Sequence, residues 1–237
     1  MAGVGKVVEN TEGRTAIVTG GTGGLGAAVT AAFLEGGWRV VVPWVAEAEL
    51  ERVERREGLE LVQADLMDPG SAAEVARAAG PATRAVVNLV GGFAMGGRVH
   101  ETPVDEFEAQ LRLNLRPTYL VTAAALPAML AAGEGAVVCV SSRAALRPFA
   151  GAAGYVTAKA AVLALVDALH AEYVGDGLRV NAVLPSVIDT PANRASMPDA
   201  DFDTWVRPAQ IARVVRFLCS DDAAVTSGAH VPVYGRA

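Results

Sequence analysis

The segment TAIVTGGTGGLG, residues 15–26, contains a short β-branched run followed at once by a glycine-rich turn and the start of a helical pattern. A strand, a glycine turn and a helix in this order form the local structure that binds a pyrophosphate. Glycine lets the backbone turn tightly and approach the phosphates, whose charge is favoured by the N-terminus of the following helix. The segment therefore predicts a phosphate cradle. Two registers are possible, GxGxxG on Gly21, Gly23 and Gly26 or TGxxxGxG on Gly20, Gly24 and Gly26.

Strand-like and helix-like segments alternate along the rest of the chain. Apolar and β-branched runs predict strands at residues 15–19, 39–42, 59–62, 85–90, 136–140, 178–183 and 231–233. Helical patterns lie at residues 24–35, 46–56, 71–79, 104–113, 117–131, 155–173 and 208–218. Apolar runs that do not alternate, separated by helices, are typical of a parallel sheet covered on both faces. We therefore expect one α/β domain over residues 1–237, a doubly wound Rossmann-type, mostly parallel sheet of about seven strands with helices on both faces and an N-terminal tail at residues 1–13.

The composition excludes several classes of protein. With 52% hydrophobic and 19% charged residues the chain is long and apolar enough to bury a substantial core. A net charge of −6 argues against nucleic acid or an anionic membrane as a partner, and we expect no signal peptide and no membrane span. Cys139 and Cys219 lack metal-site or CxxC neighbours, so we interpret both as buried reduced thiols of a cytoplasmic protein. The three histidines share no ligand spacing, and no metal is expected.

A tyrosine and a lysine four residues apart, Tyr155 and Lys159, form the strongest chemical signal. The chain has two lysines against eighteen arginines, and a helix places residues i and i+4 on one face. A free tyrosine has a pKa of about 10, which a nearby ammonium lowers, so that the phenol exchanges a proton near neutral pH. Ser142, thirteen residues before Tyr155, is expected to hold and polarise a carbonyl oxygen, because no base that would make it a nucleophile accompanies it.

Taken together, the glycine turn, Asn88, Asn114, Ser142 and the Tyr155–Lys159 pair resemble the short-chain dehydrogenases/reductases, in their short single-domain branch. The resemblance covers residues 14–235 and implies the TGxxxGxG register. It implies catalytic roles for Ser142, Tyr155, Lys159 and Asn114, the last supporting a proton relay to the lysine. It implies a site for NAD or NADP made of residues that lie near the carboxyl ends of the strands, namely Gly20, Thr22, Gly23, Gly24, Leu25, Gly26, Trp44, Asp65, Leu66, Asn88, Gly91, Tyr155, Lys159, Pro185, Ile188 and Thr190.

The chain departs from the family pattern at four positions. Leu89 replaces the second Asn of the NNAG motif, and Ser186 replaces the usual Gly after Pro185. At the end of the second strand an acid would bind the ribose 2′-hydroxyl of NAD, and a nearby Arg would accommodate the 2′-phosphate of NADP. Trp44 and Val45 occupy those positions, so the sequence leaves the choice between the two cofactors open.

By the same resemblance, the expected activity is hydride transfer between a nicotinamide and a carbonyl or secondary alcohol, with Tyr155 as the acid/base. A 3-oxoacyl-type or other small to medium ketone, and a sugar or polyol, remain alternative substrates. A dinucleotide-sensing or scaffold protein is the alternative outside the enzymes. Residues 191–205 are expected to form a substrate lid, and a homo-oligomer, tetramer or dimer, is expected. The predicted pocket has an apolar wall, Phe93, Met95, Leu146, Phe149 and Trp205, and three possible anion anchors, Arg143, Arg147 and Arg194.

Overall fold

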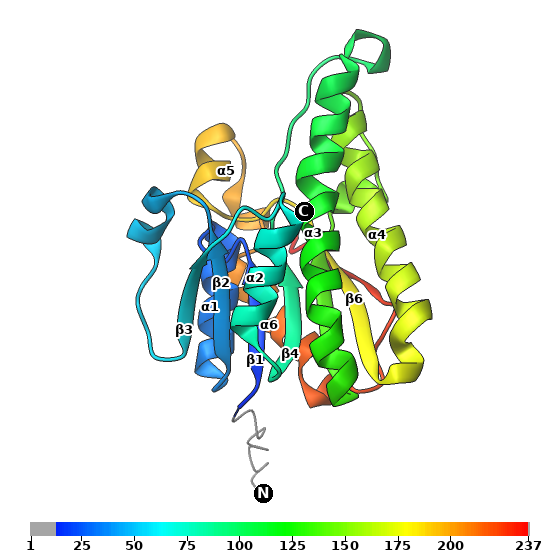
Figure 1. The fold of residues 1–237 in the computed structure, drawn as a ribbon. Coiled ribbons are helices and arrows are strands. Elements are labelled where there is room, and N and C mark those ends of the chain that lie inside the picture. The colour runs from blue at the N-terminus through cyan, green and yellow to red at the C-terminus, as the bar shows by residue number, and fades with distance from the viewer. Residues whose placement is uncertain (1–12, 237) are drawn as a thin grey trace, which may run out of the picture.

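The computed structural model describes residues 13–236 and consists of one seven-stranded parallel sheet (Figure 1). The strand order is β3-β2-β1-β4-β5-β6-β7, so the chain reverses direction across the sheet at the boundary between β1 and β4. The strands are β1 Thr15–Thr19, β2 Arg39–Trp44, β3 Leu59–Gln63, β4 Thr83–Asn88, β5 Gly135–Val140, β6 Leu178–Pro185 and β7 His230–Val233. The predicted doubly wound fold is confirmed. The predicted tail at residues 1–13 lies almost wholly outside the described residues.

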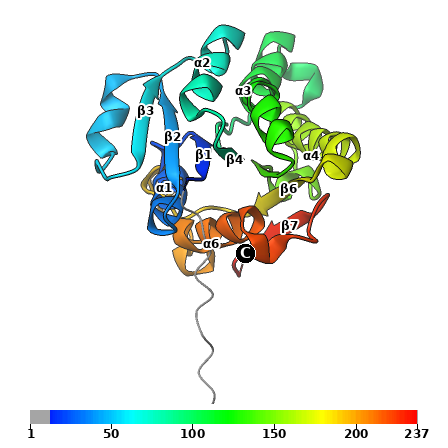
Figure 2. The ribbon, with the colours of Figure 1, turned by 60° about the horizontal axis from the view of Figure 1, so that its bottom comes forward.

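Helices cover both faces of the sheet. The α-helices are α1 Gly24–Glu35, α2 Pro69–Ala79, α3 Val104–Ala132, α4 Ala153–Tyr173, α5 Pro191–Ser196 and α6 Pro208–Cys219. Alternate strand residues enter two separate cores, with Ile17 and Val137 facing α2, α3 and α4 and Val18 and Val138 facing α1 and α6 (Figure 2). Because both faces are buried, the strands read as continuous apolar runs, and this is why their positions could be predicted.

Two helix predictions were wrong. The pattern at residues 46–56 forms only a 3₁₀-helix, η1, at Glu47–Arg52. The four charged residues 54–57 that follow are all exposed, so a longer helix would have no apolar face to bury. The patterns at 104–113 and 117–131 form the single helix α3, which continues through Pro117. Proline removes one backbone hydrogen bond there, and the burial of Pro117, Thr118 and Val121 against the sheet offsets that cost.

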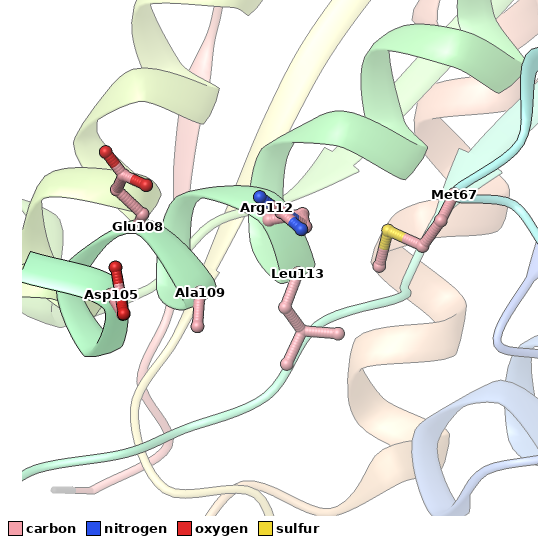
Figure 3. Close-up of a pocket in the computed structure, with 6 residues that line it drawn as sticks. All are labelled: Met67, Asp105, Glu108, Ala109, Arg112 and Leu113. Atoms are coloured by element: carbon pink, nitrogen blue, oxygen red, sulfur yellow. The ribbon is translucent and has the colours of Figure 1, made fainter.

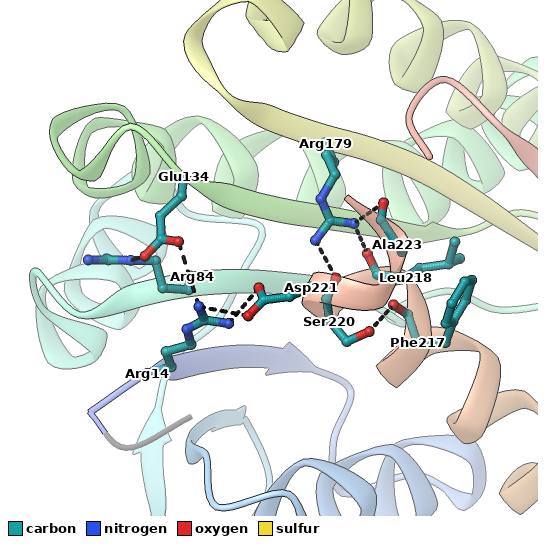
Figure 4. A network of polar contacts seen from close by, with 9 residues as sticks. All are labelled: Arg14, Arg84, Glu134, Arg179, Phe217, Leu218, Ser220, Asp221 and Ala223. Atoms are coloured by element: carbon teal, nitrogen blue, oxygen red, sulfur yellow. Dashed lines mark hydrogen bonds and ion pairs between the residues drawn. The ribbon is translucent and has the colours of Figure 1, made fainter. Parts of the chain in front are cut away.

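The amino edge of the sheet, where the parallel strands begin, is closed by arginine side chains (Figure 4). Arg179 of β6 donates to the carbonyl oxygens of Leu218, Ser220 and Ala223 at distances of 2.5, 2.9 and 3.2 Å. These carbonyls lie at and just beyond the C-terminus of α6, where a helix leaves its last acceptors unpaired. Arg14, just before β1, donates to Asp221 at 2.9 Å. The network holds α6 to the start of the sheet.

The long helices α3 and α4 are apolar enough, by length and composition alone, to cross a membrane. One face of each packs into a core instead, through residues such as Val121 and Met129 of α3 and Val162 and Val166 of α4. These helices therefore have the character of core helices of an α/β domain. Both cysteines are buried and free, and among residues 13–236 no group of three potential metal-ligating side chains occurs.

Candidate active site

The glycine turn lies at the carboxyl edge of the sheet, between β1 and α1. A Cβ atom on Gly26 would lie 1.9 Å from the Gly20 carbonyl oxygen, and one on Gly24 would lie 3.0 Å from the Thr190 methyl group. At Gly23 the nearest atom would be 3.3 Å away, which leaves room for a side chain after a small adjustment. Steric need thus falls on Gly20, which has a φ of +65°, and on Gly24 and Gly26, the residues of the TGxxxGxG register. A Cβ on Gly21 would lie 2.7 Å from the Val42 methyl groups, so Gly21 is needed for packing against β2 in either register, and the room at Gly23 is what separates the two.

The same turn fits a pyrophosphate. Helix α1 starts at Gly24 with no side-chain cap and no acidic residue in its first turn, so its first backbone N–H groups face an uncrowded, exposed surface. Such N–H groups and the helix dipole favour a bound anion. Because the exposed Gly24 has no Cβ atom, the phosphates can approach the backbone closely there.

Ser142 and Tyr155 meet beside this turn. Ser142 follows β5, and its Oγ accepts a hydrogen bond from the N–H of Ala144 at 3.1 Å, so its own proton stays available for donation. Tyr155 lies in the first turn of α4, near enough to Ser142 for the two hydroxyl groups to interact. Burial raises the pKa of the Tyr155 phenol, and the interaction with Ser142 opposes that rise. Tyr155 therefore carries its proton at neutral pH.

Lys159 lies one turn further along α4 and is 6% exposed. Its Nζ donates to the Val140 carbonyl oxygen at 3.1 Å and lies 5.9 Å from the centre of the Tyr155 ring. Burial lowers the pKa of Lys159 to about 8, so it is mostly an ammonium at pH 7. The expected lowering of the Tyr155 pKa by this ammonium is not what the structure shows. Burial of the phenol raises its pKa, and one of the three lysine N–H groups already donates to the Val140 carbonyl oxygen.

Asn114 joins the group from the middle of α3. Its side chain makes a two-way contact with Gly92, accepting from the backbone N–H at 3.1 Å and donating to the carbonyl oxygen at 3.0 Å. A Cβ on the neighbouring Gly91 would lie 2.6 Å from Asn114 Oδ1 and 3.0 Å from Lys159 Nζ. The backbone after β4 thus fits between the helical residues Asn114 and Lys159. The structure brings all four predicted catalytic residues to one edge of the sheet.

Comparison with known proteins identifies the family of this chain. The family model described as short chain dehydrogenase matches residues 14–201. The chain belongs to the short-chain dehydrogenase family. It is accordingly an oxidoreductase that uses NAD or NADP and acts on CH–OH groups.

Relatives span nearly the whole chain. The 2-(R)-hydroxypropyl-CoM dehydrogenase of Xanthobacter autotrophicus is 33% identical over 94% of this chain and 97% of its own. The 2,5-dichloro-2,5-cyclohexadiene-1,4-diol dehydrogenase LinX of Sphingobium indicum is 29% identical over 94% and 95%. A solved short chain dehydrogenase/reductase family protein, 32% identical, superposes with a TM-score of 0.86 over 95% of this chain and 97% of its own.

The other predicted cofactor residues of this short-chain dehydrogenase differ in how exposed they are. Asn88 is buried, and its Nδ2 donates to the Thr122 hydroxyl at 2.9 Å. This bond ties the end of β4 to α3. Asp65 is exposed after β3 and accepts from the N–H of Met67. The remaining predicted residues line the turn or the ends of β2, β3 and β6, with Thr22, Leu66 and Pro185 buried and Leu25, Trp44, Ile188 and Thr190 half-buried.

An aromatic wall lies beside Tyr155. The Phe93 ring meets the Tyr155 ring edge-on at 5.0 Å between centroids and lies 6.3 Å from the Phe149 ring. Phe93 and Phe149 are 57% and 47% exposed, so they offer apolar surface to a substrate. The prediction of Trp205 for this wall was wrong, because Trp205 is buried and packs against Phe202 at 4.8 Å.

The predicted anion anchors differ in availability. Arg194 pairs with Asp189 through two hydrogen bonds of 2.5 and 2.9 Å, and its guanidinium lies over the Phe202 ring. These contacts fix α5 against the end of β6 and leave Arg194 little freedom to bind substrate. Arg143 lies over the Tyr234 ring at 5.3 Å, while Arg147 is exposed.

One cavity lies away from this site, on the outer side of α3. It has a volume of about 330 Å³ and lies between Met67 and the first three turns of α3 (Figure 3). Asp105, Glu108 and Arg112 give it charges of both signs. None of the four predicted catalytic residues lines it.

Two site residues were missed from the sequence. Ser141 donates to the Lys159 carbonyl oxygen at 2.7 Å and ties β5 to α4 next to the catalytic lysine. Gly92 holds Asn114 with its backbone. The pairs Ser141–Ser142 and Gly91–Gly92 were visible signals, but only one member of each fits a family motif.

Proposed function

We propose that this short-chain dehydrogenase interconverts a ketone and a secondary alcohol with Tyr155 as the proton donor and acceptor. The observation that carries the proposal is the meeting of Ser142, Tyr155 and Lys159 at the carboxyl edge of the sheet, beside the glycine turn. Ligands of doubly wound sheets bind at this edge, next to the point where the strand order reverses. A bound nicotinamide would supply the hydride.

The chain's own residues handle the proton. Ser142 donates to the substrate oxygen and orients it, while the Tyr155 hydroxyl passes its proton to that same oxygen as the carbonyl becomes an alcohol. The Lys159 ammonium has two N–H groups besides the one that donates to Val140, and these would hold ribose hydroxyls. Its positive charge would offset part of the cost that burial imposes on the phenolate left on Tyr155. Asn114 fixes the backbone that packs against Lys159 and supports the relay that returns a proton.

The wall of Phe93 and Phe149 favours an apolar substrate. Aromatic surface beside the reacting oxygen stabilises an aliphatic or aromatic ketone more than a sugar, whose hydroxyls need polar partners. Two relatives are named for the oxidation of secondary alcohols, one aliphatic and one cyclic. We assign a small to medium ketone, 3-oxoacyl-type compounds included, ahead of a sugar or polyol. We expect α5 and the segment up to residue 205 to act as its lid.

Tyr155→Phe tests the assignment. It removes one hydroxyl and keeps the ring against Phe93, so dinucleotide binding should persist while turnover of a ketone panel falls by about 10³-fold or more. Tyr173→Phe, which removes the same hydroxyl from a tyrosine at the far end of α4, is the control and should keep most activity. Full turnover by Tyr155→Phe would overturn the role of this residue. Dinucleotide binding with no turnover by the wild-type protein across ketones, alcohols and sugars would instead favour a sensor or scaffold.

We further propose a homodimer through the exposed faces of α3 and α4. A groove of about 430 Å³ between these helices is lined by Leu111, Arg112, Leu115, Arg116, Tyr119, Ala161 and Leu165. Tyr119 is 57% exposed, and its burial by a second copy would remove apolar area from water. Light scattering should show a dimer or a multiple of it, and Tyr119→Glu should shift it to a monomer. A wild-type monomer at micromolar concentration would contradict the proposal.

A cytoplasmic location remains a prediction.

A further inference from the structure

Glu49 reaches back from the segment after β2 to the glycine turn. Its Oε2 accepts a hydrogen bond from the Thr22 hydroxyl at 2.5 Å. Its Oε1 accepts from the backbone N–H groups of Val45 and Ala46 at 3.2 and 2.9 Å. Both carboxylate oxygens are therefore held, one by the β1–α1 turn and one by the end of β2. The carboxylate is half-buried and fixed in place.

This position coincides with the part of a dinucleotide site that reads the adenosine ribose. In doubly wound sheets an acidic residue about 20 residues after the glycine motif, beyond β2, binds the ribose 2′-hydroxyl. Glu49 comes 23 residues after Gly26, because 49 minus 26 is 23. Trp44 fills the place at the end of β2 where the acid was expected, and η1 brings Glu49 back to the turn.

We propose that Glu49 makes this enzyme select NAD over NADP. The inference rests on the proposed dinucleotide binding and names the residue that chooses between its two forms. A 2′-phosphate would bring up to two negative charges next to a fixed carboxylate, well within the screening length of about 8 Å at physiological ionic strength. The same carboxylate accepts hydrogen bonds from a 2′-hydroxyl, which suits NAD. The Thr22 hydroxyl cannot donate a hydrogen bond to the 2′-phosphate of NADP, because it already donates to Glu49.

The test is the ratio of dissociation constants for NADPH and NADH in three proteins. The wild type should bind NADH at least about tenfold more tightly, as expected for a like-charge contact. Glu49→Gln keeps a carbonyl acceptor for Val45 and Ala46 but removes the charge, so the ratio should fall by about tenfold through tighter NADPH binding. Glu47→Gln removes the same charge from an exposed residue of the same 3₁₀-helix and should leave the ratio unchanged.

A second variant separates charge from hydrogen bonding. Thr22→Val removes the contact to Glu49 while the carboxylate stays, so NADH should still be preferred. The inference would be overturned if the wild type preferred NADPH, or if the ratio of the NADPH and NADH dissociation constants were the same in the wild type and in Glu49→Gln. Either result would leave the proposed function intact. Failure of the folded wild-type protein to bind either dinucleotide would overturn both. Circular dichroism of each variant establishes that it is folded.

Discussion

At the amino edge of the sheet, Arg179 satisfies three carbonyl groups at the end of α6 and Arg14 pairs with Asp221 (Figure 4). At the carboxyl edge the chain exposes Gly23 and Gly24, leaves the start of α1 uncapped and buries the ammonium of Lys159. At the amino edge the polar groups bind other groups of the same chain. At the carboxyl edge, donors and charges remain able to bind a cofactor or substrate. This arrangement lowers the free energy of unfolding.

The comparison predicts different consequences for substitutions at the two edges. Changes at the amino edge should lower the free energy of unfolding and leave dinucleotide affinity unaltered. Changes at the carboxyl edge should remove function, and some of them should stabilise the protein. The following substitutions probe this division.

Gly26→Ala should have the largest effect. The new Cβ would lie 1.9 Å from the Gly20 carbonyl oxygen, so the turn must move, and displacement by about 1 Å can cost about 10²-fold in activity. We expect at least this loss in dinucleotide affinity, measured by fluorescence titration, together with a loss of about 1 to 3 kcal/mol in stability.

Gly23→Ala is the matched control, because its Cβ meets nothing closer than 3.3 Å. It should bind within a few fold of the wild type. Equal losses in the two variants would mean that Gly23 also approaches the phosphates, as the GxGxxG register requires, and that the steric assignment of the register is wrong.

Arg179→Ala should lower the free energy of unfolding by about 2 to 4 kcal/mol in urea titrations. Three carbonyl oxygens lose a charged donor, and unpaired buried acceptors cost about 1 to 3 kcal/mol each before water reaches them. Asp221→Asn weakens only an exposed ion pair and should cost less than about 1 kcal/mol. Both variants should keep the wild-type affinity for dinucleotide. Loss of that affinity in Arg179→Ala at a temperature where it is folded would show that the two edges are coupled.

The sequence predicted some parts of this molecule better than others for physical reasons. Strand starts were predicted within two residues because the five central strands are buried on both faces and read as apolar runs, and even the half-buried edge strands β3 and β7 keep short apolar segments. The fusion of two predicted helices through Pro117 could not be predicted, since it depends on burial against the sheet. The site was predicted from sequence spacing, because Ser142 directly follows one strand and Tyr155 and Lys159 lie one turn apart on one helix. Glu49 was missed because its contact with Thr22 depends on the path of a loop, which no spacing specifies.

Lys159→Met should have a small effect on stability, in the direction opposite to that of Arg179→Ala. Lowering the lysine pKa from 10.5 to about 8 corresponds to a cost of about 3 kcal/mol for burying the ammonium, with 1.36 kcal/mol for each pKa unit. The variant avoids this cost but leaves the Val140 carbonyl without its donor, which takes back about 1 to 3 kcal/mol. A net gain of about 1 kcal/mol at pH 7 follows, with turnover abolished.

The pH dependence gives the sharper measurement. Below pH 8 Lys159 is charged in both the folded and the unfolded protein, and the folded state bears the full cost of burial. As the pH rises through 8, the folded protein releases this proton before the unfolded chain does, so the cost declines. The advantage of Lys159→Met should therefore shrink by about 1 kcal/mol between pH 7 and pH 9. Burial raises the pKa of Cys139 and Cys219 to about 12 in the wild type. Cys219 affects both proteins alike. The charge of Lys159 slightly lowers the pKa of Cys139, but that thiol stays protonated in the folded protein through pH 9 with or without the lysine, so its effect also largely cancels in the difference. An advantage that stayed constant over this range would mean that the ammonium is well solvated, and that the carboxyl edge stores no electrostatic cost at Lys159.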